Sequence, residues 1–426
     1  MRRLRVSSVL SKKLSAVGLL VLIVSLLTSR NLTPSAPRDD SVTPVQYTIE
    51  PSPAAYALYP SDSTQLRNPK AVQKAIDFLT RLQPDGTYVL SAPNDQNIVP
   101  MDVAHAAIAL AKVDRRPQAE AAMNWLYGLM ILPGPGSYDA PLDADFAGSW
   151  YDQIQTDGRP ADHATRGRGE AVGIALIATY TIYREDPAYI HTRVGDNRII
   201  DLVRLSVAYL TQPSMQTTDG RFYHSPDYQV PFNEEGARMT LGLKLASEML
   251  AAGGDQTIAK LAAERSALGL QALRKGEGIS QGMAYDYYAM SIWGLATPAE
   301  ASSEMSWLKS TGLVNQYGVK NWDWQLTTAS TFPTWLRWWV QAQTITPAPT
   351  FDYAIAALSA GDVNTALRIE QEWVPRQRND GGFDDAYLFG LRVGVSPPTS
   401  YAVARFLMLE RLLTDVVGST SNLHPM

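Results

Sequence analysis

The chain has 426 residues, with 37 lysines and arginines against 42 aspartates and glutamates, and it contains no cysteine. The lack of cysteine excludes disulfides, thiolate zinc sites, iron–sulfur clusters and a cysteine nucleophile. A hydrophobic content of 45% excludes a disordered chain, and a formal net charge of −5 gives no case for nucleic-acid binding.

Residues 1–30 have the pattern of a secretory signal. All six charges in this segment are basic, and an apolar run extends from Ala16 to Leu27. A basic start followed by about a dozen apolar residues is typical of an export signal and is short for a membrane span. Pro37 follows Ser35-Ala36 and disfavours cleavage there, so an uncleaved signal-anchor is the alternative to a cleaved peptide. Both predict a body that is secreted, periplasmic or tethered outside the cytoplasmic membrane.

Residues 31–67 are predicted to be an extended linker. Prolines recur here among serines and threonines without a helical period, which is typical of a tether. Beyond residue 30 the chain holds 31 basic and 42 acidic residues, a balance of −11. This charge favours solubility and disfavours contact with nucleic acid or anionic lipid, so membrane anchorage would depend on the N-terminal apolar segment.

Residues 68–416 are predicted to form one helical domain, followed by a tail over 417–426. Apolar residues recur at i, i+3, i+4 and i+7, with almost no alternating strand pattern. The expected helices cover residues 69–82, 101–113, 117–131, 168–184, 197–212, 234–251, 255–274, 284–296, 299–311, 328–343, 351–375 and 398–415.

These helices alternate between two kinds. Helices such as 69–82 carry charges on one face, whereas helices such as 101–113 are apolar nearly all round, which indicates burial on every side. Asp-Gly-x-aromatic turns follow several amphipathic helices, and acids begin several buried ones. The turns are Asp85-Gly86-Thr87-Tyr88, Asp219-Gly220-Arg221-Phe222 and Asp380-Gly381-Gly382-Phe383, and the acids are Asp102, Glu170, Glu235 and Asp286.

Six amphipathic and six buried helices in alternation predict an all-α fold, a closed ring of six hairpins with the buried helices inside. This pattern resembles the (α/α)6 toroid of six-hairpin glycosidases, some polysaccharide lyases and terpenoid cyclases. Arg168-Gly169-Glu170-Ala171, followed by Asp186-Pro187-Ala188-Tyr189-Ile190, is similar to the second-helix signature of six-hairpin carbohydrate-active proteins. The resemblance covers residues 68 to 413, and an open helical solenoid is the alternative.

The longest loop, residues 133–169, is expected at the mouth of the ring where the inner-helix N-termini gather. Connections longer than about 15 residues are uncommon and are usually functional or disordered. A lid that only packs on the ring is the alternative. Substrate-binding candidates in this loop are Trp150, Tyr151, His163, Arg166 and Arg168.

The acids at the starts of the buried helices are the catalytic candidates. Glycoside hydrolysis needs two carboxylates, one to donate a proton and one to assist attack. Glu170 is expected to be one of them and Asp286 its partner, with Asp102 and Glu235 in reserve. The alternative is structural. Acids in a helix's first turn can simply stabilise the helix through its dipole, and neighbouring arginines can hold Glu170 in an ion pair.

Aromatic residues near the predicted helix starts are candidates for stacking on sugar rings, because phenol and indole rings offer a flat apolar face with a polar edge. Trp322 and Trp324 flank Asp323 and would share one side of an extended segment. Tyr287 and Asp385 are further candidates at the mouth. For Asp385, turn chemistry after Gly381-Gly382 is the alternative.

Other site chemistries find no support in the sequence. It has no glycine-rich phosphate loop, no HExxH motif and no Gly-x-Ser-x-Gly nucleophile elbow. The five histidines lack metal-ligand spacing, so no metal and no cofactor are expected. His105, on an apolar face, is expected to be a core residue.

The leading hypothesis is an exported enzyme that hydrolyses a polysaccharide with two carboxylates. Family resemblance implies inversion of the anomeric centre, and Glu170→Gln is expected to abolish turnover. A second hypothesis is a polysaccharide lyase with Tyr287 or His163 as its base and Arg166 or Arg168 neutralising a uronate. A third is a non-catalytic, envelope-tethered protein that binds glycans.

Overall fold

The computed structural model describes residues 66–83, 86–93, 95–133, 144–276, 288–320, 344–384, 387–388, 393–394 and 398–421. The predicted signal segment, the linker up to residue 65 and the last five residues lie outside these ranges. Within them, no helix is long and apolar enough to cross a membrane.

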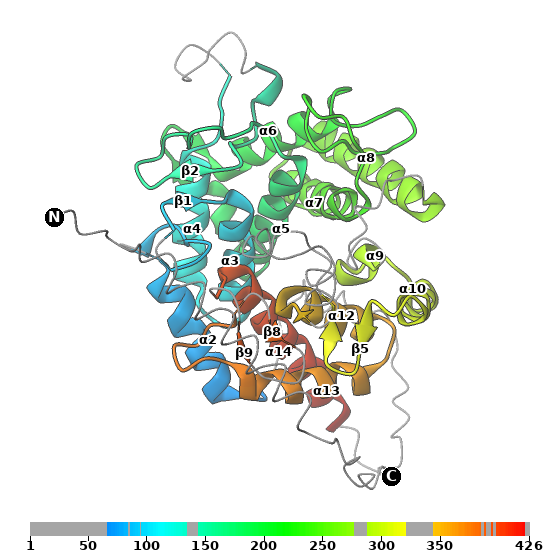
Figure 1. Cartoon of the computed structure of the whole chain (residues 1–426). Helices are drawn as coiled ribbons and strands as arrows, with labels where there is room; N and C mark the ends of the chain where they lie inside the picture. Colours follow the sequence, from blue (N-terminus) through cyan, green and yellow to red (C-terminus); the bar gives the residue numbers. More distant parts are fainter. Residues whose placement is uncertain are drawn as a thin grey trace, which may run out of the picture. The chain divides into compact units, whose positions relative to one another are not determined.

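The described chain is mostly helical, and successive helices alternate between an outer and an inner position (Figure 1). The outer helices are α2 (Pro69–Arg81), α4 (Arg116–Gly128), α6 (Ile199–Thr211), α8 (Gln256–Lys275), α10 (Pro298–Ser310) and α13 (Val363–Trp373). The inner helices are α3 (Pro100–Lys112), α5 (Gly169–Glu185), α7 (Asn233–Ala252), α9 (Ala289–Ile292), α12 (Pro347–Ser359) and α14 (Ser400–Ser421).

The inner helices contact one another in cyclic order. α3 packs on α5, α5 on α7, α7 on α9, α9 on α12, α12 on α14, and α14 returns to α3. Their composition explains the position: in α5 every residue from Gly169 to Ile182 is buried, whereas α2 buries only one face. The ring of helical hairpins that the alternating pattern predicted is therefore confirmed, and the open solenoid is excluded.

Two expected helices differ from the structure. The stretch 351–375 is two helices, inner α12 and outer α13, separated by a turn at Gly361 with φ +78°. Asp362 begins the second helix, because its side chain accepts a hydrogen bond from the Thr365 backbone N–H. The inner helix expected over 284–296 is described only as the single turn α9, and the helix expected over 328–343 lies outside the described residues. The last helix, α14, reaches Ser421, five residues into the segment predicted to be a tail.

Short antiparallel strands of two residues decorate the ring. β1 (Asn97–Ile98) pairs with β2 (Ile154–Gln155), β3 (Arg193–Val194) with β4 (Asn197–Arg198), and β5 (Val314–Asn315) with β6 (Gly318–Val319). β7 (Thr344–Ile345), β8 (Tyr387–Leu388) and β9 (Val393–Gly394) form a three-stranded sheet in that order. The β1–β2 pair matters for the site, because it fixes the long loop before α5 to the segment before α3.

The repeated Asp-Gly turns connect neighbouring outer helices. Gly220 has φ +99°, and a Cβ atom there would lie 2.3 Å from the Leu268 carbonyl oxygen of α8, so only glycine fits. Gln216 donates through Nε2 to the carbonyls of Gly220, at 3.1 Å, and of Arg265 in α8, at 2.9 Å. Each such glutamine therefore ties a turn to the next outer helix. The same pairs of bonds run from Gln83 to Thr87 and Gln118, and from Gln377 to Gly381 and Ala71.

Candidate functional site

Three of the predicted acids gather where adjacent inner helices begin. Asp102 stands in the first turn of α3, Glu170 in that of α5 and Glu235 in that of α7. The Glu170 charge raises the pKa of both other carboxyls, so Asp102 and Glu235 each lie within electrostatic reach of Glu170. We call these three residues the carboxylate cluster.

Glu170 is held between two arginines. Its side chain is buried, with Oε2 2.6 Å from Nη1 of Arg238 and Oε1 3.7 Å from Nη1 of Arg168. Arg168 also reaches Oδ2 of Asp152 in the long loop, at 3.3 Å. Both Glu170 oxygens are thus engaged by guanidinium groups, so the residue is well placed to supply a fixed negative charge to its neighbours.

Glu235 is buried, only 3% exposed, and its carboxyl group contacts a histidine ring. Nδ1 of His224 lies 2.9 Å from Oε1 and 3.0 Å from Oε2 of Glu235. Burial raises the pKa of Glu235 to about 7, and the Glu170 charge adds to the rise, whereas the hydrogen bond from His224 opposes it. A carboxyl of this kind is partly protonated at neutral pH and can donate a proton.

Asp102 has an intermediate exposure, and its pKa is also raised. Burial raises it to about 6; the nearby Ser91 hydroxyl opposes the rise, and the Glu170 charge adds to it. Asp102 and Glu235 therefore both have pKa values raised toward neutrality, where a carboxyl can accept or donate a proton.

Arg238 is a buried arginine that contacts both Glu170 of the cluster and side chains of the core. It pairs with Glu234 one turn earlier on α7, and its Cζ lies 5.9 Å from the centre of the Trp293 ring. Burial lowers the pKa of Arg238, but the neighbouring Glu170 and Tyr401 outweigh it, so the pKa is raised overall. A buried arginine needs such partners, because an unpaired buried charge is costly.

A second buried ion pair continues this interior network. Arg405 of α14 pairs with Asp352 of α12, whose Oδ2 accepts a hydrogen bond from the Tyr401 hydroxyl at 3.1 Å. The Arg405 guanidinium lies 4.9 Å from the Trp293 ring, on which Arg238 also rests. Two buried arginines, each paired with a carboxylate, therefore lie close to the same indole ring.

His105 is a core residue, as predicted. It is fully buried beside Tyr401 and Trp293, and its Nδ1 lies 2.9 Å from the Met101 carbonyl oxygen. Burial, with the charges of Arg238 and Arg405, lowers its pKa well below the usual range, so the ring is neutral.

The long loop places its predicted binding residues unequally. Trp150 is only 1% exposed, and its indole N–H donates to the Leu126 carbonyl at 2.7 Å, so it belongs to the core and offers no face to a sugar. Tyr151 is half-buried and its backbone bridges to Arg166. The Arg166 guanidinium lies 4.4 Å from the Phe146 ring and therefore braces the loop.

His163 lies exposed at a turn of the same loop, with φ +66°. Arg168, another predicted binding residue of this loop, reaches the carboxylate cluster through Glu170. The remaining candidates, catalytic Asp286 and binding Tyr287, Trp322, Asp323, Trp324 and Asp385, lie outside the described residues.

Sequence reasoning missed His224 and Arg238. His224 stands in the loop between α6 and α7, and no spacing rule connects it to Glu235 eleven residues later. Arg238 did carry a signal, since a lone arginine in an otherwise apolar helix must find a carboxylate partner. Glu234, one helical turn before it, was the visible candidate.

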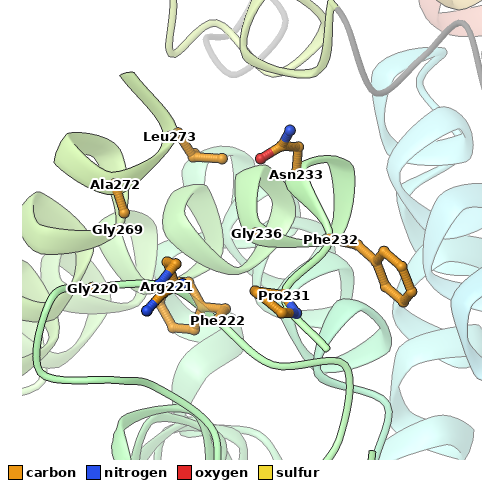
Figure 2. A pocket seen from close by; sticks show the side chains of 10 residues that line it. All are labelled: Gly220, Arg221, Phe222, Pro231, Phe232, Asn233, Gly236, Gly269, Ala272 and Leu273. Atoms are coloured by element: carbon orange, nitrogen blue, oxygen red, sulfur yellow. The ribbon is translucent and has the colours of Figure 1, made fainter. Parts of the chain in front are cut away.

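A separate small pocket lies between the start of α7, the end of α8 and the loop that holds Phe222. Figure 2 shows Asn233 and Leu273 above it and the Phe232 ring turned away from it. No member of the carboxylate cluster lines this pocket, so we treat the two as distinct features. Among the described residues, no group of acids and histidines is arranged to hold a metal ion.

No protein-family profile and no curated protein matches this sequence. Solved structures do share its fold. A wild-type glycosidase matches with a TM-score of 0.61 at 14% identity, over 82% of this chain and 96% of that chain. A glycosidase variant in complex with glucose gives 0.60 at 13%, over the same shares. A reducing-end-xylose releasing exo-oligoxylanase gives 0.52 at 11%, over 83% and 94%. At these identities the likeness concerns the fold alone, and the chain shares the helical fold of these solved glycosidases.

Proposed function

We propose that the protein is a glycoside hydrolase in which Glu235 donates a proton to the leaving oxygen and Asp102 activates water. The carrying observation is that the carboxylate cluster brings together two carboxyls whose pKa values are raised to about 7 and about 6. Pairs of titratable groups with separated pKa values mark acid and base roles.

Glu235 suits the acid role because burial and the Glu170 charge keep it partly protonated at neutral pH. His224 binds both of its oxygens, which fixes the direction in which the carboxyl faces. The proton moves to the glycosidic oxygen as the bond to the anomeric carbon breaks, and Glu235 is left as a carboxylate.

Asp102 suits the base role because it is the more exposed of the pair and is ionised above about pH 6. It takes a proton from the water that attacks the anomeric carbon. Glu170, which contacts two arginines, acts by raising the pKa values of Asp102 and Glu235. Direct attack by water predicts an inverted product.

The substrate class follows from fold likeness and export. The similar structures include a glycosidase variant with glucose and an exo-oligoxylanase variant with xylobiose, which supports a neutral glucan or xylan as the first substrate to test. The basic and apolar N-terminal segment supports a place outside the cytoplasm, where polysaccharides are met.

The test is a screen of the purified protein against neutral and acidic glycans, read for reducing ends and for near-ultraviolet absorbance. We expect reducing ends without absorbance, and Glu235→Gln should lower kcat by about a hundredfold or more. Glu304→Gln is the matched control, because the pKa of this carboxyl of α10 is also raised to about 7 by burial, yet it bonds to Ser291 outside the cluster.

The outcomes separate the competing functions. An unsaturated, ultraviolet-absorbing product would make the protein a lyase, and binding without any cleavage would make it a glycan-binding protein. Full hydrolytic activity in folded Glu235→Gln would remove that residue from the acid role.

A further inference from the structure

We propose that Tyr228 is the stacking platform of a sugar subsite directly beside Glu235. This inference rests on the proposed function, because the sugar is taken to be part of the substrate. Tyr228 is 54% exposed, which is unusual for so large a ring among the described residues. A single exposed aromatic needs no explanation by itself. Its connection to the carboxylate cluster is what points to a ligand.

One histidine links the exposed ring to the acid. The His224 ring meets the Tyr228 ring edge to face, with centroids 5.5 Å apart and planes at 82°. Nδ1 of the same histidine lies 2.9 Å from Oε1 of Glu235. Tyr228 is thus separated from the Glu235 carboxyl by a single side chain, that of His224.

The loop holds this platform in place before any ligand arrives. The Tyr228 backbone N–H donates to Oγ of Ser225 at 3.0 Å, and the Ser225 N–H donates to the Tyr228 carbonyl at 3.3 Å. The backbone of His224 is fixed as well, since its carbonyl accepts from the N–H of Gly169 at the start of α5. A ring ordered in advance loses little conformational freedom when it binds.

A second aromatic ring supports the platform. Phe232, just before α7, lies 6.0 Å from the His224 ring and 6.3 Å from the Tyr228 ring. Phe232 also lines the pocket beside α8, but Figure 2 shows its ring turned away from the other labelled side chains of that pocket. Together the three rings form a small rigid surface with Tyr228 as its exposed part.

The chemistry of this surface favours a neutral pyranose. A tyrosine offers an apolar face for the C–H groups of a sugar ring and a polar edge for its hydroxyls. The exposed Asp227 directly precedes Tyr228 in the chain. Its acidic side chain disfavours a uronate, so a neutral gluco- or xylo-configured ring is the expected occupant.

The experiment measures binding apart from cleavage. Tyr228→Ala, Tyr228→Phe and Trp307→Ala are each made in the Glu235→Gln protein, and calorimetry follows binding of gluco- and xylo-oligosaccharides of two to six units. Trp307 is the matched control, because it is 46% exposed on the outer helix α10. The same three changes in the wild-type protein report KM and kcat, and circular dichroism checks folding.

We expect Tyr228→Ala to weaken oligosaccharide binding, and to raise KM, by about tenfold, with kcat changed by less than about twofold. Tyr228→Phe keeps the flat face, so its affinity should stay within about threefold of that of the parent protein. Trp307→Ala should bind as tightly as the parent. Unchanged affinity in folded Tyr228→Ala would overturn the platform even if the enzyme hydrolyses glycans. Weakened binding in a protein that cleaves no glycan would support the platform and overturn the proposed hydrolase. A parent that binds none of these oligosaccharides would overturn the platform as well.

Discussion

Glu170 acts on two neighbours at once, and this shapes the expected pH dependence of catalysis. Its charge raises the pKa of Asp102 and of Glu235, which are about 6 and about 7. We expect kcat/KM to rise as Asp102 ionises and to fall as Glu235 ionises, so a profile from pH 4 to 9 should show a narrow maximum between those values. Each limb should therefore follow the ionisation of one of these two carboxyls.

Glu170→Gln tests the origin of both limbs. Removing the negative charge should lower the pKa of Asp102 and of Glu235, so the whole profile should move to lower pH while measurable activity remains. Arg168→Gln, which removes a guanidinium from the other side, should move the Glu235 limb upward. Complete loss of turnover in folded Glu170→Gln would instead support Glu170 as one of the two catalytic carboxylates, as expected from the sequence.

At the scale of elements, α5 and α7 approach so closely that two glycines face each other. A Cβ atom on Gly242 would lie 2.7 Å from the Gly173 carbonyl oxygen, and one on Gly173 would lie 2.8 Å from the Arg238 carbonyl oxygen. This contact sets the spacing between the helix that carries Glu170 and the helix that carries Arg238 and Glu235. The backbone approach therefore supports the 2.6 Å ion pair between them.

Gly242→Ala should therefore destabilise the fold by about 1–3 kcal/mol, since the added methyl must push two backbones apart. Urea unfolding measures the change. Gly236→Ala is the control in the same helix, because its Cβ atom would meet only Leu273 at an ordinary 3.5 Å. That variant should be neutral or gain up to about 1 kcal/mol from helix propensity. Equal stability of the two variants would show that the helices can separate without cost.

Helical periodicity predicted most of these elements but could not place every boundary. The alternation of apolar and amphipathic stretches was enough for the order of inner and outer helices up to α10. Residues of α12 and α13 were predicted as one helix because apolar residues continue on both sides of Gly361. Only the Gly-Asp pair marked the turn between them. The acids of the cluster were found from their position in first turns, whereas His224 required the tertiary fold, because a loop brings it to Glu235.

At the scale of the whole ring, the first helix must be joined to the last. Asn68, at the start of α2, donates from Nδ2 to Glu370 of α13 at 2.7 Å and to Glu410 of α14 at 3.0 Å. Arg67 adds a 3.0 Å ion pair to Glu370. Gln377 completes the closure with a 2.9 Å bond to the Ala71 carbonyl. These residues form a polar clasp between chain segments about 300 positions apart.

The clasp makes the stability of the ring depend on pH. Burial raises the pKa of Glu410 to about 8, and the Glu370 charge adds to the rise, whereas the Asn68 hydrogen bond opposes it. In the unfolded chain this carboxyl ionises near its usual 4.5, so between about 4.5 and 8 the folded state holds the extra proton. The contribution of Glu410 is therefore fully present below pH 4.5 and is lost progressively as the pH rises through 8.

Glu410→Gln should remove this loss, because an amide resembles the protonated carboxyl and can donate to Glu370 while still accepting from Asn68. Its stability relative to the wild type should rise by at most about 1.4 kcal/mol per pH unit across that interval. Thermal unfolding at pH 5, 7 and 9 measures the trend. Glu264→Gln, an exposed acid on α8 in an i,i+4 pair with Lys260, should show no such trend. If the stability difference between Glu410→Gln and the wild type is the same at all three pH values, Glu410 does not take up a proton on folding, and the pH dependence has another source.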